Sequence, residues 1–270
     1  MDEMDEIAQY HIKRWEALDD ADALFTRPFF HLTAAEAAER LDPEGRLGAL
    51  AGKNVLCLAG GGGKQSAMFA LLGAQVTVLD LSQEQLQRDR AVAKHYSLSI
   101  DTVQGDMRDL SCLPKAAFDI VWHPYSLNFV PETQVVFRQV ARVLRQDGLY
   151  YLHCTNPFAV GMTEQDWNGE GYVLRYPYLQ GAEITYVDPP WVYDRTESTA
   201  PVPRPREYRH TLSTLMNGLI EQGFVIQHVS DSTDMHPNPS AEPGTWDHFV
   251  AYIPPWLAIW SSYRPSANKP

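Results

Sequence analysis

The stretch NVLCLAGGGGKQSAMFALLGAQVTVLDLS, residues 54–82, decides the fold of this chain. It opens with an apolar run over 54–59 that is typical of a buried strand, passes through four consecutive glycines, and continues as an alanine-rich helical pattern over 65–74. A β-rich run over 75–80 follows and ends on Asp80. A strand, a glycine turn, a helix and a second strand in this order indicate a βαβ unit of a parallel sheet.

The same alternation of helices and strands continues to residue 154. The patterns predict further elements as follows: strands at 99–104, 118–123 and 149–154, and helices at 82–97 (with Ser82 as N-cap) and 132–148. Helix and strand patterns return near the C-terminal end as a helix over 211–223 and strands over 224–230 and 256–263. These elements predict a doubly wound α/β fold.

Outside this core the composition changes. Residues 1–52 read as helical, with Thr33 and Glu36 in the spacing of a capping box. A segment rich in proline, glycine and aromatic residues interrupts the pattern after 154, and a loop of that length without structure of its own is rare in a compact domain. We therefore expect four parts: a helical cap (1–52), a ligand-binding core (53–154), an aromatic-rich insertion that covers a bound small molecule (155–210), and a C-terminal completion of the sheet (211–270).

Composition and charge limit the classes of partner. The 270 residues carry a formal net charge of −12, and no block rich in lysine or arginine appears, which argues against a nucleic-acid partner. No apolar run approaches the roughly 20 residues that a membrane-spanning helix needs. The acidic N-terminal residues lack the apolar segment of a secretion signal, so the expected location is cytoplasmic.

The cysteines and histidines do not form a metal site in the sequence. Cys57, Cys112 and Cys154 are far apart, and no histidine lies at zinc-ligand spacing from them. Cys57 and Cys154 fall within strand-like runs, which favours buried free thiols. We expect no bound metal.

The glycine run raises the question of which ligand its loop binds. A Walker A loop needs a glycine and a hydroxyl at two positions that are Leu58 and Gln65 here, so that interpretation fails. The dinucleotide fingerprint G-x-G-x-x-G places its third glycine at Gln65 or Ser66, and neither residue lets helix and strand pack as closely as glycine does. The missing third glycine therefore argues against a dinucleotide site, but this interpretation stays open.

Two acids follow the strands beside the glycine turn. Asp80 ends the second strand 17 residues after Gly63, at a place where a carboxylate can accept hydrogen bonds from both hydroxyls of a ribose. Asp106, in QGDMRDL (104–110), follows the third strand, where its carboxylate and the backbone N–H of Met107 could bind the adenine edge. The two acids together favour an adenosyl ligand.

In this order and spacing the motifs resemble those of the class I S-adenosylmethionine-dependent methyltransferases, in particular the small-molecule branch that includes ubiquinone and menaquinone methyltransferases. The matching segments are VLCLAGGGG (55–63) at the glycine-rich first motif, VTVLDLS (76–82) at the ribose-binding acid, GDMRDL (105–110) at the adenine edge, FDIVWHPYSLNF (118–129) at the fourth strand, and VFRQVARVLRQDGLYYL (136–152) and EYRHTLSTLMNGLIEQGF (207–224) at later elements.

The resemblance implies a Rossmann-like sheet of seven strands, mostly parallel, with helices on both faces and WLAIWSSY (256–263) as the one antiparallel strand. It implies transfer of a methyl group from S-adenosylmethionine to a small, apolar or aromatic molecule. The cofactor-binding residues that it implies are Ala59, Gly60, Gly61, Gly63, Asp80, Leu81, Asp106, Met107 and His123.

Two positions depart from the family pattern. The family usually carries an acid two positions before the glycine turn, where this chain has Cys57, and its first motif glycine is here Ala59. Glycine allows φ > 0 and a close approach of the ligand, so Ala59 narrows the site. We expect the methionyl end of the ligand to be held differently, by Gln65, Ser66 or the N-terminal segment.

The residues that handle the acceptor are the least determined by the sequence. His123 ends the fourth strand, and an imidazole with an ordinary pKa near 6.5 could act as a base at neutral pH; it could equally line the cofactor pocket through its backbone. The residues that we expect to line the acceptor pocket are Tyr10, Tyr125, Asn128, His153, Trp191 and Tyr193, with plain packing as the alternative for each. A nicotinamide-dependent oxidoreductase and a non-catalytic protein that binds an adenosyl ligand stay open as rival functions.

Overall fold

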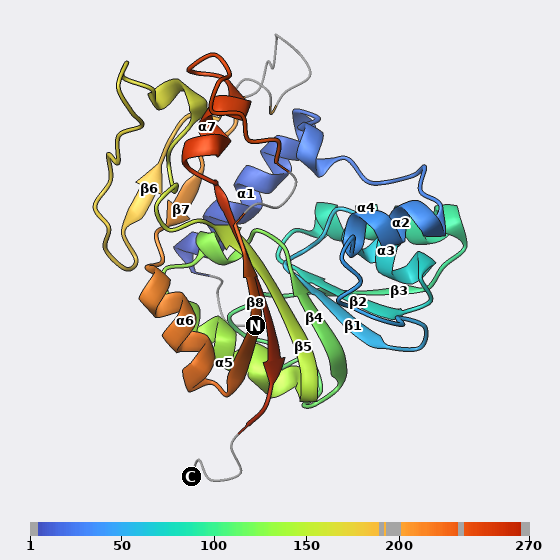
Figure 1. Ribbon diagram of the computed structural model, residues 1–270. Helices are drawn as coiled ribbons and strands as arrows, with labels where there is room; N and C mark the ends of the chain where they lie inside the picture. The colour runs from blue at the N-terminus through green and yellow to red at the C-terminus, as the bar shows by residue number, and fades with distance from the viewer. Residues whose placement is uncertain (1–4, 189–191, 193–200, 232–234, 266–270) are drawn as a thin grey trace.

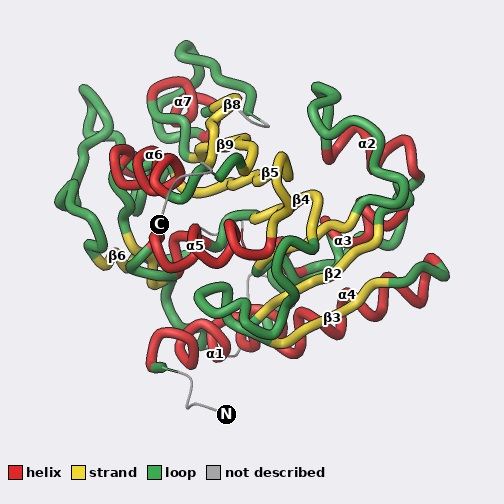
Figure 2. Tube along the Cα trace, turned by 90° about the horizontal axis from the view of Figure 1, so that it is seen from below, coloured by secondary structure: helices red, strands yellow, loops and turns green. Residues whose placement is uncertain are grey.

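The computed structural model describes residues 5–188, 192, 201–231 and 235–265. Its centre is a seven-stranded sheet in the order β3-β2-β1-β4-β5-β9-β8. The strands are β1 Asn54–Leu58, β2 Gln75–Asp80, β3 Ile100–Gln104, β4 Phe118–His123, β5 Leu144–Thr155, β8 Phe224–Ser230 and β9 Trp256–Tyr263. Figure 2 shows them as one continuous, twisted band.

The direction of the strands confirms the expected architecture. β1 pairs in parallel with β2 and with β4, β2 with β3, and β4 with β5. β9 is antiparallel to both of its neighbours, β5 and β8. The strand order changes direction at β1: the chain runs outward from β1 through β2 to β3 and then returns to the other side of β1 as β4. The connections after β1 and after β4 therefore lead to opposite sides of the sheet and leave a crevice between the carboxyl ends of these strands. Open α/β sheets bind their ligands at such a crevice.

Helices cover both faces of the sheet because each face is apolar. The helices of the described residues are α1 Glu6–Asp20, α2 Ala34–Leu41, α3 Gln65–Leu71, α4 Gln83–Tyr96, α5 Thr133–Val143, α6 Leu212–Glu221 and α7 Trp246–Tyr252, with short 3-10 turns η1 Leu24–Thr26, η2 Leu127–Phe129 and η3 Glu164–Asp166. One core cluster joins the sheet to α5 and α6, and a second joins its other face to α2 and α3. α5 and α2 accordingly lie on opposite sides of the strand band (Figure 2).

The helix α1 lies above the carboxyl ends of the strands and so covers the crevice (Figure 1). Asp5 is the N-cap of α1, and its side chain accepts a hydrogen bond from the backbone N–H of Ala8. Farther along, the expected capping box of Thr33 and Glu36 begins α2, and Ser82 caps α4, as the sequence predicts. Local capping therefore fixes where these helices start.

One helix boundary was predicted wrongly. The expected helix over 132–148 ends at Val143, and β5 begins at Leu144, because Leu144 pairs with Phe118 of β4. The register of that pairing shifts before Leu149, where Asp147 adopts φ 61°. Pairing with β4 thus overrides the helical pattern of these residues.

Two smaller differences concern the end of α3 and the presence of α7. α3 ends at Leu71 and not at residue 74, and Gly73, with φ 83°, follows its end. The seven-residue helix α7 has no counterpart among the predicted elements. Its sequence is short and follows a loop rich in proline and glycine, so it carries little periodic signal.

The aromatic-rich segment contains a two-stranded antiparallel sheet of β6 (Glu183–Thr185) and β7 (Arg206–Tyr208). β7 also lies against η2, which follows β4. The segment therefore has secondary structure of its own and lies beside the carboxyl end of the sheet (Figure 1). The four-part division of the chain stays a prediction.

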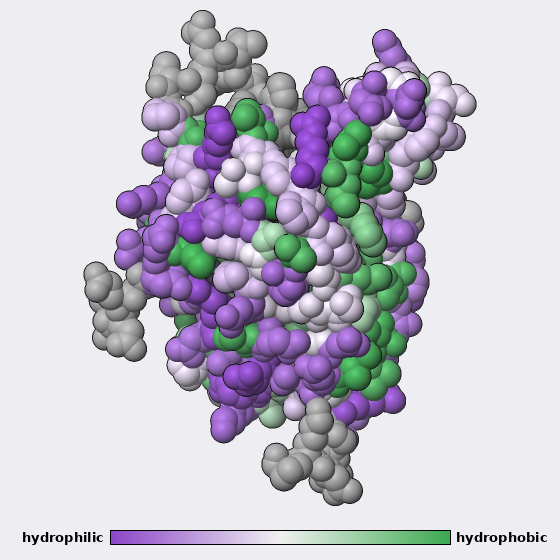
Figure 3. Space-filling model, turned by 90° about the vertical axis from the view of Figure 1, so that its left-hand side faces the viewer, coloured by the Kyte–Doolittle hydropathy of each residue, from purple (hydrophilic) through white to green (hydrophobic). Residues whose placement is uncertain are grey.

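The surface is mixed in character. On the side shown in Figure 3, a band of hydrophobic residues runs between hydrophilic ones. Exposed apolar side chains of the described residues include Val225 and Val229 of the edge strand β8 and Ile220 of α6. Within the described part of the chain, no helix has the length and hydropathy needed to cross a membrane.

Candidate active site

The glycine turn after β1 is held by a buried carboxylate from α4. The two oxygens of Asp89 accept hydrogen bonds from the backbone N–H groups of Gly62 and Gly63, each at 3.0 Å, and from the hydroxyl of Ser66. Burial raises the pKa of Asp89 to about 7. Gly62 and Gly63 have φ of 109° and 71°, a conformation that side-chain-bearing residues rarely adopt. Asp89 therefore satisfies the donors that this turn exposes.

Ala59 occupies the start of the turn with φ 46°, a left-handed conformation that costs a residue with a Cβ roughly 1–2 kcal/mol. Its N–H donates to the carbonyl of Leu79 at 2.7 Å. The chain thus turns at a residue that carries a Cβ, and the left-handed conformation of Ala59 is strained.

Asp80 lies directly against the turn. Its Oδ2 accepts a hydrogen bond from the N–H of Gly61 at 2.9 Å, and its Oδ1 accepts one from the N–H of Ser82 at 2.9 Å. A Cβ at Gly61 would lie 3.0 Å from Asp80 Oδ2, so glycine is needed for this approach. Burial raises the pKa of Asp80. Each oxygen of the carboxylate keeps a lone pair for a further donor.

Asp106 is paired with a cation that also reaches α1. The guanidinium of Arg108 makes charge-assisted hydrogen bonds to both Asp106 oxygens, with Nη2 at 2.6 Å from Oδ2. The same guanidinium binds Asp5, with Nη2 at 2.9 Å from Oδ1. The side-chain hydrogen bond from Arg108 lowers the pKa of Asp5 to about 2. Arg108 thereby ties the first turn of α1 to the loop after β3.

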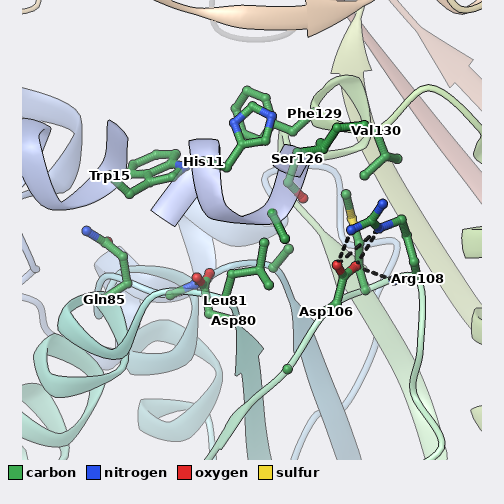
Figure 4. A pocket seen from close by; sticks show the side chains of 16 residues that line it. His11, Trp15, Asp80, Leu81, Gln85, Asp106, Arg108, Ser126, Phe129 and Val130 are labelled. Carbon is green, nitrogen blue, oxygen red and sulfur yellow. Dashed lines mark hydrogen bonds and ion pairs between the residues drawn. The ribbon is translucent and has the colours of Figure 1, made fainter. Parts of the chain in front are cut away.

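A small cavity of about 70 Å³ lies between α1 and the strand ends (Figure 4). The residues that line it are Ile7, Ala8, His11, Trp15, Ala59, Gly61, Asp80, Leu81, Gln85, Gly105, Asp106, Met107, Arg108, Ser126, Phe129 and Val130. In Figure 4, His11 and Trp15 lie on one side of the cavity and Asp80 and Asp106 on the other. The two acids expected from sequence therefore face the same space.

His11 is the ionisable group of α1 that faces this cavity. It is buried, its ring lies 4.9 Å from that of Phe129, and neither ring nitrogen has a well-formed hydrogen bond. Burial lowers the pKa of His11 to about 4. The imidazole is therefore neutral at pH 7.

A second cavity of about 440 Å³ continues from the first, and the two share the walls formed by Trp15, Ala59, Gly61, Ser126 and Phe129. It extends beneath the aromatic-rich segment and α7. Its other aromatic walls are Phe25, Tyr125, Tyr186, Trp246, Phe249 and Trp256. Its volume lies within the range of roughly 300–1,000 Å³ that is usual for small-molecule sites.

A buried glutamate of β7 lines the larger cavity. Glu207 Oε1 accepts a hydrogen bond from the hydroxyl of Tyr186 at 2.7 Å, and the hydroxyl of Tyr125 lies 3.4 Å from both carboxylate oxygens. Thr155 donates its hydroxyl hydrogen to the Tyr125 oxygen at 2.7 Å. Glu207 is 3% exposed, and burial raises its pKa.

The position of His123 differs from the expected one. Its imidazole is fully buried, with Nδ1 2.8 Å from the hydroxyl of Tyr150, and it lines neither cavity. Burial lowers the pKa of His123 to about 3. The side chain therefore points into the core and not toward an acceptor, which weighs against a role as base.

The other expected acceptor residues separate into three groups. Tyr125 and His153 line the larger cavity. Tyr10 and Asn128 line neither cavity: the Tyr10 hydroxyl donates to the carbonyl of Arg204, and the Asn128 amide holds the backbone of Thr155 and Tyr208. Trp191 and Tyr193 lie outside the described residues.

The residues expected to bind the cofactor also differ in which cavity they line. Ala59 and Gly61 line both cavities and Gly60 lines the larger one, whereas Gly63 is turned toward α4 and lines neither. Leu81 and Met107 line the small cavity. Gln65 lines the larger cavity, but the Ser66 hydroxyl is bound to Asp89, away from both.

Three residues of this site are missing from the sequence-based prediction: Asp89, Arg108 and Glu207. Asp89 lies within a helix among other charged residues, and Glu207 lies in the segment whose fold was unpredictable. Only Arg108, inside the QGDMRDL motif, carried a signal, because an arginine two residues after Asp106 can pair with it.

Comparisons with known proteins agree with this geometry. Residues 56–152 match the family described as "Methyltransferase domain". An uncharacterized methyltransferase, YbaJ, of Bacillus subtilis is 35% identical over 176 residues, which are 65% of this chain and 67% of YbaJ. A ubiquinone biosynthesis O-methyltransferase of Xanthomonas oryzae pv. oryzae is 35% identical over 107 residues, but the match covers 40% of this chain and only 45% of that protein.

Solved structures with a similar fold also include methyltransferases. The structure of an S-adenosylmethionine-dependent methyltransferase from Mesorhizobium loti matches with a TM-score of 0.58 at 21% identity, over 85% of this chain and 99% of that one. Nothing among these matches supports the nicotinamide alternative. The chain therefore belongs to the class I S-adenosylmethionine-dependent methyltransferases.

Proposed function

We propose that this chain transfers the methyl group of S-adenosylmethionine to a small apolar or aromatic molecule. The observation that carries the proposal is the pair of adjoining cavities. One adjoins Asp80 and Asp106 at the carboxyl edge of the sheet, and aromatic side chains form part of the wall of the other. The glycine turn forms part of the wall of both, so a donor and an acceptor bound there would meet at the turn.

The side chains present fit an adenosyl ligand. Asp80 keeps free lone pairs on both oxygens beside the turn, as a ribose with two hydroxyl donors requires. The position of Gly61 has no room for a side chain, because a Cβ there would lie 2.7 Å from the Cβ of Gln85. When bound, S-adenosylmethionine supplies a methyl group activated by a sulfonium. The chain's own contribution is to align the acceptor and to exclude water.

The sheltered aromatic cavity supports a small acceptor over a macromolecular one. Its walls come from α1, the loop after β4, the aromatic-rich segment and α7, which lie on different sides of the space. Such enclosure suits a molecule that is buried on most of its surface. The net charge of −12 further disfavours a nucleic-acid acceptor.

Replacement of Asp80 tests the assignment. We expect Asp80→Ala to weaken the binding of S-adenosylhomocysteine at least tenfold, a loss of about 1.4 kcal/mol, because the ribose hydroxyls lose their acceptor. Isothermal titration calorimetry with S-adenosylhomocysteine and with NAD, on wild type and variant, measures this loss.

The matched control is Asp101→Ala, which removes an exposed acid from β3 and leaves the crevice intact. Both variants are compared by thermal unfolding, since Asp80 also accepts hydrogen bonds from the backbone of the turn. Unchanged affinity for S-adenosylhomocysteine in a folded Asp80→Ala protein would refute the proposed function, as would tighter binding of NAD to wild type.

A further inference from the structure

Glu207 contributes a carboxylate to the wall of the larger cavity, and no described residue forms an ion pair with it. Its direct hydrogen-bond partners among the described residues are the phenolic hydroxyls of Tyr125 and Tyr186. Phenols are weaker partners for a carboxylate than an ammonium or a guanidinium, because they carry no charge. A buried carboxylate satisfied only by neutral groups is costly in the empty protein. A cationic ligand would remove that cost.

Among the described residues, the arginine and the lysine that line the cavity contact other groups. The guanidinium of Arg14 binds Asp188 at 2.6 and 3.1 Å and also donates to the carbonyl of Pro203. The ammonium of Lys64 lies 5.3 Å from the centroid of the Phe29 ring. Neither one forms an ion pair with Glu207. Among the residues that the structure describes, Glu207 thus faces the cavity without an ion pair of its own.

The aromatic walls favour the same kind of ligand. Trp15, Phe129, Trp246 and Trp256 line the cavity together with the two tyrosines beside Glu207. The faces of aromatic rings attract cations, by roughly 0.5–2 kcal/mol for each ring that is well placed. An acid flanked by aromatic rings is a typical arrangement for the binding of an organic ammonium.

We propose that the methyl acceptor is an amine on an aromatic or apolar body, and that Glu207 binds its ammonium group and accepts the proton that this group must lose. The inference rests on the proposed function and names the class of its acceptor. In the proton step, one N–H bond breaks, the proton moves to a Glu207 oxygen, and the nitrogen keeps the electron pair. The amine thereby becomes a neutral nucleophile within the cavity.

The chemistry of the site agrees with this proton step. An ammonium is no nucleophile, so an amine acceptor needs a proton acceptor at hand. Burial of Glu207 makes its carboxylate more basic than an exposed one. The imidazole of His123, which the sequence suggested as a base, faces Tyr150 in the core.

The experiment compares amines with alcohols of the same shape. Wild-type protein saturated with S-adenosylhomocysteine is titrated at pH 7 with three pairs: benzylamine and benzyl alcohol, 2-phenylethylamine and 2-phenylethanol, and 4-phenylbutylamine and 4-phenylbutanol. Binding is followed by tryptophan fluorescence, because three tryptophans line the cavity. We expect the amine of at least one pair to bind ten times more tightly than its alcohol.

Two variants locate the preference. Glu207→Gln keeps the shape of the side chain and removes its charge, so the amine and the alcohol should then bind within threefold of each other. Glu164→Gln removes another acid that lines the same cavity and should leave the tenfold preference. Thermal unfolding shows that each variant is folded; should Glu207→Gln fail to fold, the wild-type comparison decides alone.

The inference is overturned if no amine binds to wild type, if the amines bind no more tightly than the alcohols, or if folded Glu207→Gln keeps the preference. Its failure differs from failure of the proposed function. A protein that binds S-adenosylhomocysteine but lacks the preference for amines keeps the methyltransferase assignment and loses only its amine acceptor. A protein that binds no S-adenosylhomocysteine loses the assignment itself.

Discussion

At the scale of single residues, the site depends on where its carboxylates come from. The family pattern places an acid at the position of Cys57 on β1, and this chain has there a buried thiol whose pKa burial raises. The carboxylate beside the glycine turn comes instead from Asp89 of α4, which is fully buried and accepts three hydrogen bonds. A carboxyl group is thus present near the turn, although it comes from another element.

Exchange of the Asp89 carboxylate for an amide should therefore loosen the turn. In Asp89→Asn, the NH₂ group replaces an acceptor and faces a backbone N–H donor, so at least one of the two glycine hydrogen bonds is lost. We expect about tenfold weaker binding of S-adenosylhomocysteine and a lower melting temperature, measured by calorimetry and thermal unfolding. Asp101→Asn, on the surface, is the control and should change neither.

A second substitution separates a positioning role from mere stability. Cys57→Asp introduced into Asp89→Asn returns a carboxylate to the vicinity of the turn and should recover part of the ligand affinity. Cys57→Asp alone places two acids together in the core and should destabilise the protein. If the double variant binds no better than Asp89→Asn, the idea that one acid substitutes for the other fails.

The sequence could predict Asp80 and Asp106, and it could not predict Asp89 or Glu207. Asp80 ends β2 and Asp106 follows β3, and these neighbouring parallel strands bring both acids to one edge of the sheet. Asp89 and Glu207 acquire their roles through tertiary contacts, with Gly62 and with Tyr186, that no local pattern records. Residues at element ends are predictable here, and residues that act across elements are not.

At the scale of elements, α1 closes the crevice through charged contacts at its first turn. The cavity beneath it, about 70 Å³, is too small for an adenosyl group, since small-molecule sites usually measure roughly 300 Å³ or more. Arg108 binds both Asp5 at the start of α1 and Asp106 after β3. We therefore expect α1 to move and this bridge to open when the proposed ligand enters.

Removal of the bridge should speed entry. We expect Arg108→Gln to raise the association rate of S-adenosylhomocysteine severalfold, because α1 loses its ion pair with the sheet edge and Asp106 is freed for the ligand. Stopped-flow fluorescence can follow binding through Trp15, which lines the cavity. Arg27→Gln, which removes the exposed pair with Asp22, is the control. An unchanged or slower association rate would contradict the bridge.

The elements show the same limit of prediction as the residues. Periodicity and caps fixed the starts of α2 and α4, because Thr33 and Ser82 act on backbone within three residues of themselves. The end of α5 was missed, because it is set by pairing of Leu144 with Phe118, 26 residues earlier in the chain. Local chemistry is readable in the sequence, whereas competition from a distant strand is not.

At the scale of the whole molecule, buried ionisable groups have opposite effects on the free energy of unfolding as pH falls. Burial lowers the pKa of His11, His123 and His210 to between about 3 and 4, so below pH 6.5 the unfolded state takes up protons that the folded state refuses. Acidification from 6.5 toward 4 therefore destabilises through these groups. Asp89, with its pKa raised to about 7, binds a proton in the folded state first and has the opposite effect.

A difference between two proteins isolates one of these contributions. His11→Phe replaces a buried imidazole that lacks a well-formed hydrogen bond with a ring of similar shape against Phe129. The wild type loses about 1.4 kcal/mol for each pH unit below 6.5 through His11, down to pH about 4, and the variant does not. The free energy of unfolding of the variant, relative to wild type, should therefore rise by about that amount per unit. Urea denaturation of both proteins at pH 7.5, 6.5, 5.5 and 5.0 measures it, with His31→Phe, at an exposed position, as the control. A difference that stays constant with pH would mean that His11 takes up its proton equally well in the folded protein, and that α1 leaves it open to water.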